Sequence, residues 1–219
     1  KKVYFIFNLI CSISILNAQW INQESGVFAN LIDVSFADPM NGCIIGEEAT
    51  ILTTNDCCQN WVKRKCPVED ATFTAIQIID VSNGFIVGND GLILKSVDGG
   101  KTWLQIYNQF DYNFSDISFI DSQNEWISCW LTDYNSPSSR DGAILHTSDG
   151  GIQWEIQLEI FGDIYDGTQF TSIDFFDGNI GWALGSSFVT ENSPTYIYKT
   201  TNGGSVWEEL ATVYTKPLR

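Results

Sequence analysis

A turn sequence that ends in tryptophan recurs along the chain and constrains its fold more than any other feature. It reads Ser-Val-Asp-Gly-Gly-Lys-Thr-Trp over residues 96–103 and returns with the same spacing over 147–154 and 200–207. A degenerate copy over 54–61 carries Cys-Cys in place of the glycine pair. The shared pattern is a hydroxyl residue, any residue, Asp or Asn, a glycine pair, two variable positions and Trp. Four copies in one chain predict a repeat protein.

The chemistry of this turn indicates that it joins two antiparallel strands. Glycine accepts the positive φ of a tight hairpin turn. The Asp or Asn side chain, and more weakly the hydroxyl, accepts hydrogen bonds from backbone N–H groups of the turn. The Trp begins the next strand and offers a large apolar surface to a neighbouring unit. The residues given this structural role are Thr54, Asp56, Trp61, Ser96, Asp98, Gly100, Trp103, Thr147, Asp149, Gly151, Trp154, Thr200, Asn202, Gly204 and Trp207.

Each turn is preceded by segments with the alternation of half-buried strands. The first segment of each unit alternates apolar and polar residues and ends in Asp38, Asp80, Asp121 or Asp177. A second begins four residues later, and a third leads into the turn, so that the Trp opens a fourth. Four short antiparallel strands per unit predict an all-β fold made of β-propeller blades. A parallel β-helix, which needs a shorter and more uniform repeat, is the less favoured alternative.

The turn is similar to the Asp-box, or bacterial neuraminidase repeat (BNR). The whole unit resembles the repeats of the photosystem II stability and assembly factor-like family, and this resemblance covers roughly residues 20–211. It implies a β-propeller, commonly of about seven blades, with an assembly-factor-like role. The Asp-box alone is shared with sialidases, sortilins and several glycosidases, so it points to the fold more than to an activity.

The number of units predicts an open arc of a larger ring rather than a closed one. Trp20 resembles the start of a fourth strand without its three partners, while four complete units follow it. A self-closed four-blade ring is the alternative. We expect a signal peptide and then propeller blades over 19–219, divided into an orphan outer strand and four blades. The expected ranges are 1–18 for the signal peptide, 19–29 for the orphan strand, and 30–66, 72–108, 113–159 and 169–212 for the blades.

The N-terminus and the composition predict an exported protein without affinity for nucleic acid. Lys1 and Lys2 precede an apolar run, and Ala18 offers a cleavage site. We therefore expect a secreted, cell-surface or periplasmic protein with no membrane insertion after cleavage. The formal net charge of −16 opposes binding to nucleic acid and to anionic membranes.

The candidate ligand-binding residues lie in long loops on the face opposite the Asp-box turns. These loops cover 130–141, 155–169 and 186–194, and loops carry function more often than scaffold strands do. Their aromatic and charged side chains suit a protein or carbohydrate partner. The candidates are Trp130, Tyr134, Arg140, Asp163, Tyr165, Asp166 and Phe188.

No catalytic residue, metal ligand or cofactor is predicted. Sialidases hold the substrate carboxylate with three arginines, and this chain has only Arg64, Arg140 and Arg219. A glycosidase needs two carboxylates, but the 27 acidic residues single out no pair. No Cys/His spacing resembles a zinc site, and no glycine-rich loop leads into a helix.

Cysteines of an exported chain raise the question of disulfides. Cys57 and Cys58 replace the glycine pair of the first turn, and Cys43 opens a strand at the same end of that unit. We predict a pair between Cys43 and Cys57 or Cys58, with reduced thiols as the alternative.

These features together predict a secreted, non-enzymatic β-propeller that binds a protein or glycan as an assembly scaffold. The alternative is a fragment of an exported Asp-box glycosidase, sialidase-like or xyloglucan-degrading, whose catalytic carboxylates lie elsewhere.

Overall fold

The computed structural model describes residues 22–106, 112–132, 140–160, 168–187 and 194–214. Within these ranges the chain forms sixteen β-strands. The described residues contain no helix long and apolar enough to cross a membrane.

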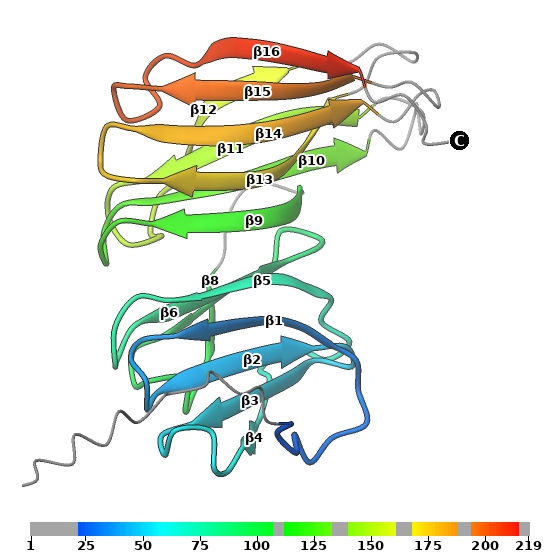
Figure 1. Cartoon of the computed structure of the whole chain (residues 1–219), viewed down its shortest axis with the longest axis vertical. Helices are drawn as coiled ribbons and strands as arrows, with labels where there is room; N and C mark the ends of the chain where they lie inside the picture. Colours follow the sequence, from blue (N-terminus) through cyan, green and yellow to red (C-terminus); the bar gives the residue numbers. More distant parts are fainter. Residues whose placement is uncertain (1–21, 107–111, 133–139, 161–167, 188–193, 215–219) are drawn as a thin grey trace, which may run out of the picture.

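The strands form four separate four-stranded sheets, here called blades 1 to 4 (Figure 1). Blade 1 contains β1 (Leu31–Phe36), β2 (Gly42–Gly46), β3 (Thr50–Thr54) and β4 (Val62–Arg64). Blade 2 contains β5 (Phe73–Ile78), β6 (Gly84–Gly88), β7 (Ile93–Ser96) and β8 (Leu104–Ile106). Blade 3 contains β9 (Asn113–Phe119), β10 (Glu125–Thr132), β11 (Arg140–Thr147) and β12 (Glu155–Ile160). Blade 4 contains β13 (Thr168–Phe175), β14 (Gly181–Ser187), β15 (Pro194–Thr200) and β16 (Glu208–Tyr214).

Every blade is an antiparallel meander in which strands adjacent in sequence are paired. The first strand of each blade shifts register near its start, for example between Leu31 and Asp33 and between Phe73 and Ala75. A β-bulge at the same place in each blade increases the local twist. The all-β, four-stranded antiparallel architecture predicted from the sequence is confirmed.

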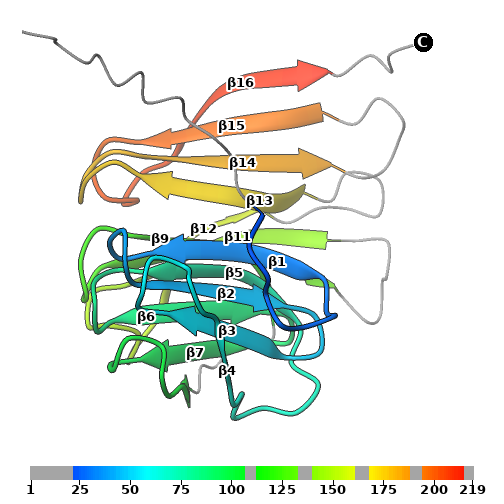
Figure 2. The same cartoon turned by 60° about the horizontal axis from the view of Figure 1, so that its bottom comes forward.

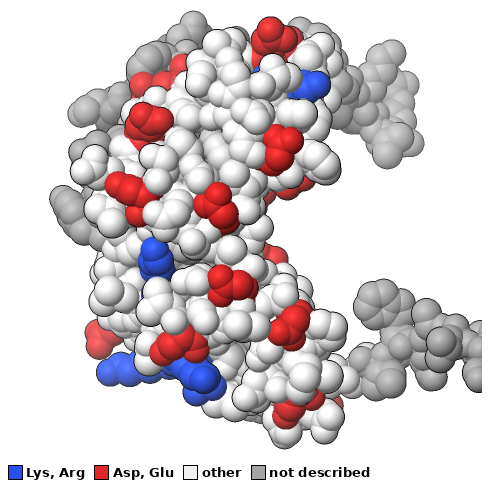
Figure 3. Space-filling view, turned by 90° about the vertical axis from the view of Figure 1, so that its left-hand side faces the viewer, with Lys and Arg blue, Asp and Glu red and all other residues white. Residues whose placement is uncertain are grey.

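The four blades follow one another around an arc, with their first strands innermost. β1 packs beside β5, β5 beside β9, and β9 beside β13 (Figures 1 and 2). The face that carries the Asp-box turns has a C-shaped outline, hollowed on one side, and acidic side chains are spread over it (Figure 3). The hydrophobic cores lie between consecutive blades, since residues of β2, β3, β5 and β6 share one cluster and those of β10, β11, β13 and β14 another.

Side chains of each first strand bind the backbone of the next first strand. The backbone N–H of Ile78 donates to Ser35 Oγ at 2.8 Å, and that of Phe175 donates to Ser118 Oγ at 2.9 Å. At the middle junction the N–H of Phe119 donates to Gln77 Oε1 at 3.0 Å. These bonds satisfy backbone donors that the sheets leave unpaired, and they fix the register of one blade on the next.

One predicted element is not formed where the structure can be read. An orphan outer strand was expected over 19–29, but residues 22–30 contain no strand, and the prediction is corrected for this part. Trp20 lies outside the described residues. Among the described residues there is no three-stranded blade that such a strand could complete. Each described sheet already contains four strands, and Phe28 is fully exposed.

Candidate functional site

The Asp-box turns form a set of rigid, nearly identical corners on one face. In the second turn Ser96 Oγ accepts the N–H of Gly100 at 2.9 Å and donates to Asp98 Oδ1 at 2.9 Å. Asp98 Oδ1 also accepts the N–H of Thr102 at 2.9 Å. Equivalent bonds hold the turns of Thr54, Thr147 and Thr200. The hydroxyl groups of the turns, and the Asp or Asn side-chain oxygens that they contact, are therefore engaged within their own turn, which fits a scaffold role.

The carboxylates of these turns are held in the ionised form. Hydrogen bonds from the Asn60 side chain and backbone lower the pKa of Asp56. Burial alone would raise the pKa of Asp98, but bonds from Thr102 and Ser96 outweigh it and lower the pKa. Backbone and side-chain donors stabilise the charged form of a carboxylate.

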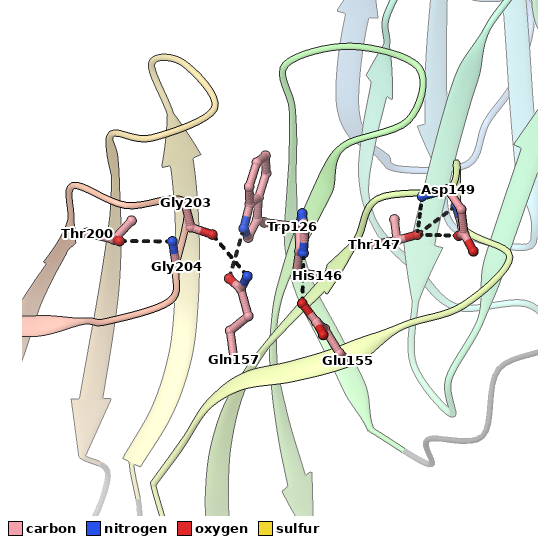
Figure 4. Close-up of polar contacts among 10 residues, drawn as sticks. Trp126, His146, Thr147, Asp149, Glu155, Gln157, Thr200, Gly203 and Gly204 are labelled. Carbon is pink, nitrogen blue, oxygen red and sulfur yellow. Dashed lines mark hydrogen bonds and ion pairs between the residues drawn. The ribbon is translucent and has the colours of Figure 1, made fainter.

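A polar side chain of one blade reaches the Asp-box turn of the next blade at two junctions. Lys95 Nζ donates to the carbonyl oxygen of Gly150 at 2.7 Å. Gln157 Nε2 donates to the carbonyl oxygen of Gly203 at 3.0 Å, while its Oε1 accepts the indole N–H of Trp126 at 3.0 Å (Figure 4). Gln157 is the third residue after Trp154, and Arg64 occupies the same place after Trp61. The junction between blades 1 and 2 thus has Arg64 at the position that Gln157 holds in the junction between blades 3 and 4.

A polar pocket opens at this first junction, between blades 1 and 2. Its volume is about 90 Å³. Residues of both blades line it: Asn41, Thr53, Thr54, Asn55, Val62, Arg64, Val81, Asp98, Gly99 and Lys101. The pocket brings Arg64 and Lys101 together beside an Asp-box turn.

The two cations of the pocket are available to an anionic ligand. Arg64 is half-buried, and its Nε donates to Thr53 Oγ1 at 2.8 Å, which orients the guanidinium. Among the described residues, neither Arg64 nor Lys101 forms an ion pair. The one carboxylate of the lining, Asp98, is occupied by Ser96 and Thr102. A guanidinium matches a carboxylate in shape and hydrogen-bond geometry, so the pocket suits a carboxylate group.

The structure places few of the predicted ligand-binding residues. Trp130 lies in β10 opposite Gly142, and Arg140 opens β11 opposite Thr132. These two positions are close in the hairpin. The other predicted residues, Tyr134, Asp163, Tyr165, Asp166 and Phe188, lie outside the described residues.

Glu125 is a buried carboxyl that sequence reasoning did not single out. It opens β10 at the place held by glycine in the other three blades, and neither of its oxygens has a hydrogen-bond partner among the described residues. Burial raises the pKa of Glu125 to about 9; Asp149 and Asp121 add to this, and Lys95 opposes it. The carboxyl is therefore protonated at neutral pH. The signal available in the sequence was that a glutamate replaces glycine at this position of the repeat.

The predicted pairing of Cys43 with Cys57 or Cys58 is not formed. The five cysteines of the described residues are free. Cys43 points into the core shared with blade 2, where a Cβ on Gly100 would lie 3.8 Å from its Sγ. A Cβ on Gly100 of blade 2 would thus face the preceding blade. Cys58 holds the same place in blade 1, so its side chain faces away from blade 2. The two thiols therefore lie on opposite faces of one sheet.

The described residues do not assemble a metal site. In the ranges that the structure covers, no group of three His, Cys, Asp or Glu residues is placed to hold a metal ion. His146 stacks on Trp126, with ring centroids 4.6 Å apart, and its Nδ1 lies 3.2 Å from Glu155 Oε1 (Figure 4).

Comparisons with known proteins agree with the repeat and with the blade architecture. Residues 13–111 match the family described as Photosynthesis system II assembly factor YCF48. Over 148 residues the chain is 31% identical to the Photosystem II assembly lipoprotein Ycf48 of Synechococcus sp. (strain CC9902), which covers 65% of this chain and 41% of that protein. The chain thus spans about two-fifths of the length of the curated relative it matches.

Solved structures show the same fold. YCF48 bound to D1 peptide has a TM-score of 0.52 and 16% identity, over 84% of this chain and 82% of that chain. An ancestral GH74 enzyme has a TM-score of 0.60 and 13% identity, over 85% of this chain and 28% of the enzyme. At such identities the likeness establishes the fold alone, and the prediction of β-propeller blades is confirmed.

Proposed function

Because residues 13–111 match the family model of photosynthesis system II assembly factor YCF48, and 148 residues are 31% identical to a Ycf48 protein, we propose that the chain is a Ycf48-like BNR-repeat β-propeller and a non-enzymatic scaffold that binds a segment of another protein. The observation that carries the proposal is the pocket between blades 1 and 2, where Arg64 and Lys101 face a cavity of about 90 Å³. A solved relative is described as bound to D1 peptide, which makes a peptide the appropriate class of ligand.

The recognised group in this proposal is a peptide carboxylate. Arg64 has its Nε fixed by Thr53, so its terminal nitrogens can donate to both oxygens of a carboxylate at little cost in side-chain entropy. Lys101 adds a second positive charge at the rim. The pocket thus carries two positive charges in a chain whose formal net charge is −16.

The test uses one D1 peptide in two forms, with a free C-terminal carboxylate and with a C-terminal amide. We expect the chain to bind the free-carboxylate form more tightly in fluorescence anisotropy. Arg64→Ala is expected to weaken that form about 10- to 100-fold, the range for a hydrogen bond to a charged group, and to leave the amide form unchanged.

Lys63→Ala is the matched control, because Lys63 is the exposed neighbour of Arg64 on β4 and does not line the pocket. It removes the same charge from the same strand and is expected to leave binding unchanged. Equal binding of the two peptide forms, or equal losses from the Arg64 and Lys63 variants, would refute a carboxylate site.

Export is the second part of the proposal. It is supported by Lys1, Lys2 and the apolar run before Ala18. Expression of the tagged full-length chain in a bacterial host, followed by fractionation and N-terminal sequencing, should give a product that begins at Gln19 outside the cytoplasm. An uncleaved cytoplasmic product would contradict it.

A further inference from the structure

The carbonyl oxygen of an Asp-box glycine is tied to the preceding blade at two of the three described junctions. Lys95 Nζ donates to the oxygen of Gly150 at 2.7 Å, and Gln157 Nε2 donates to that of Gly203 at 3.0 Å. At the junction between blades 1 and 2 the equivalent oxygen belongs to Gly99, and no described residue donates a hydrogen bond to it. This junction therefore keeps a free backbone acceptor.

The side chains that blade 1 carries at the same two positions explain the free acceptor. Thr53 holds the place of Lys95, and Arg64 holds the place of Gln157. Arg64 Nε donates to Thr53 Oγ1 at 2.8 Å, so these two side chains bind each other instead of the next turn. In place of a bridging side chain, this junction has the polar pocket of about 90 Å³.

A second, smaller pocket adjoins the polar pocket at the same junction. Its volume is about 10 Å³, which is room for one group about the size of a water molecule or a methyl. Asn41, Val81 and Gly99 line both pockets, so the two are neighbours. The other residues that line the smaller pocket are Ala37, Gly42, Cys43, Ile78 and Asp80. The carboxylate of Asp80 is hydrogen-bonded within its own turn, so the smaller pocket suits a small apolar group.

Four recognition elements thus lie together between blades 1 and 2: the guanidinium of Arg64, the ammonium of Lys101, the carbonyl oxygen of Gly99 and a small apolar space. Every residue that lines the two pockets belongs to these two blades or to their turns. The last residue of a peptide offers the complementary set, because its carboxylate, its N–H and its side chain are all attached to one Cα. An Asp or Glu side chain offers the carboxylate without a donor on the adjacent carbon.

We propose that this site, in a role that rests on the proposed function, takes the C-terminal residue of its peptide and selects a side chain the size of alanine there. The carboxylate binds Arg64 and Lys101, and the N–H of the last residue donates to the Gly99 carbonyl. The methyl group enters the smaller pocket beside Val81. A larger side chain overfills this pocket, so the site discriminates against peptides that end in leucine.

The first experiment varies the last residue of the peptide. The D1 peptide, labelled with fluorescein at its N-terminus and carrying a free C-terminal carboxylate, is made with alanine, glycine or leucine as its last residue. We expect the full chain to bind the alanine form most tightly in fluorescence anisotropy. Glycine should weaken binding about 3-fold through loss of one buried methyl group, and leucine about 10-fold or more through overpacking.

The second experiment changes the smaller pocket. Val81 and Val97 are exposed valines of neighbouring turns, and only Val81 lines the pockets. Val81→Ala removes two methyl groups from the lining, so the preference for alanine over leucine should fall to about 3-fold or less. Val97→Ala is the matched control and should keep the full preference. An unchanged preference in the Val81 variant would overturn the assignment of the smaller pocket.

The third experiment tests the free acceptor. An ester in place of the last peptide bond removes the N–H that Gly99 accepts and keeps both the carboxylate and the methyl group. It should weaken binding about 3- to 10-fold, whereas an ester one bond earlier should leave the affinity unchanged.

The outcomes separate this inference from the proposed function. If the free-carboxylate peptide binds more tightly than the amide, but the alanine and leucine forms bind alike or the two esters are equivalent, the inference is overturned and the proposed function stands. If the free-carboxylate and amide forms bind alike, the proposed function and the inference both fail.

Discussion

The indole ring of Trp126 in blade 3 lies parallel to the ring of Phe175 in blade 4, with centroids 3.7 Å apart and an interplanar angle of 14°. The same indole donates to Gln157, which in turn bonds the turn of blade 4 (Figure 4). One side chain thus joins the apolar and polar parts of the junction between these blades.

Removal of this ring should weaken the contact between blades 3 and 4 and lower the stability of the chain. Trp126→Ala is expected to lower the free energy of unfolding by about 3–5 kcal/mol, as for other buried aromatic truncations. Trp126→Phe keeps a ring against Phe175 but loses the N–H bond and part of the buried indole, so it should cost less, about 1–3 kcal/mol. Urea denaturation followed by circular dichroism measures both, and equal losses would contradict a role for stacking.

Two adjacent threonines allow a matched test of the Asp-box turn. Thr200 is buried, its Oγ1 accepts the N–H of Gly204 at 2.9 Å, and it donates to Asn202. Thr201 is exposed. Thr200→Val should cost about 1–3 kcal/mol, since it leaves buried polar groups unpaired, and Thr201→Val should be nearly neutral. Thermal unfolding measures both variants, and equal losses of stability would refute the role of the Thr200 hydroxyl in the turn.

Gly204 is required for two separable reasons. Its φ is +88°, and a Cβ there would overlap the Gln157 amide oxygen. Gly204→Ala should therefore destabilise the chain through strain and overlap together. In a background of Gln157→Ala the overlap is gone, so the same substitution should cost measurably less. A double-mutant cycle in urea measures the difference, and additive losses would contradict the overlap.

Glu125 should make stability depend on pH between its unfolded and folded pKa values. The ordinary pKa is 4.5, and burial raises the folded value to about 9. Between these values the folded chain binds one more proton than the unfolded chain, so stability falls as pH rises, by at most roughly 1.4 kcal/mol for each pH unit. Below pH 4.5 both forms are protonated and this contribution is constant.

Glu125→Gln keeps the shape and removes the titration. We expect it to flatten the decline in melting temperature between pH 5 and pH 9 relative to the unsubstituted chain. The Asp-box carboxylates, whose pKa values are lowered, act at the acid end of the profile and serve as an internal reference. An unchanged slope in the variant would show that Glu125 does not carry the effect.

The free thiols should differ in reactivity. Burial raises the pKa of Cys43 to about 12, and Cys129 is also buried, whereas Cys57 is exposed. A thiol reagent at pH 8 should label Cys57 rapidly and label Cys43 and Cys129 only when the chain unfolds. Mass spectrometry of digested peptides identifies the labelled sites, and rapid labelling of Cys43 would contradict its burial.

The sequence was sufficient to predict the sheets because the strand alternation and the turn residues depend on local chemistry. Ser96 and Asp98 act on atoms within their own turn, so the pattern alone indicates their contacts. Arg64 and Glu125 were not recognised as site residues, because their surroundings come from two blades. The Cys43 prediction placed residues at one end of a blade correctly but did not consider which face each side chain occupies.

The bonds between consecutive blades have an evolutionary consequence. In the part of the chain that the structure describes, each blade contacts the blades next to it in sequence, through a position that Ser35, Gln77 and Ser118 occupy in successive units. Insertion or loss of one whole unit therefore recreates an existing kind of junction instead of demanding a new one. Gene duplication can change the number of blades in such a chain in a single event, and mutations within the units can diversify the pockets afterwards.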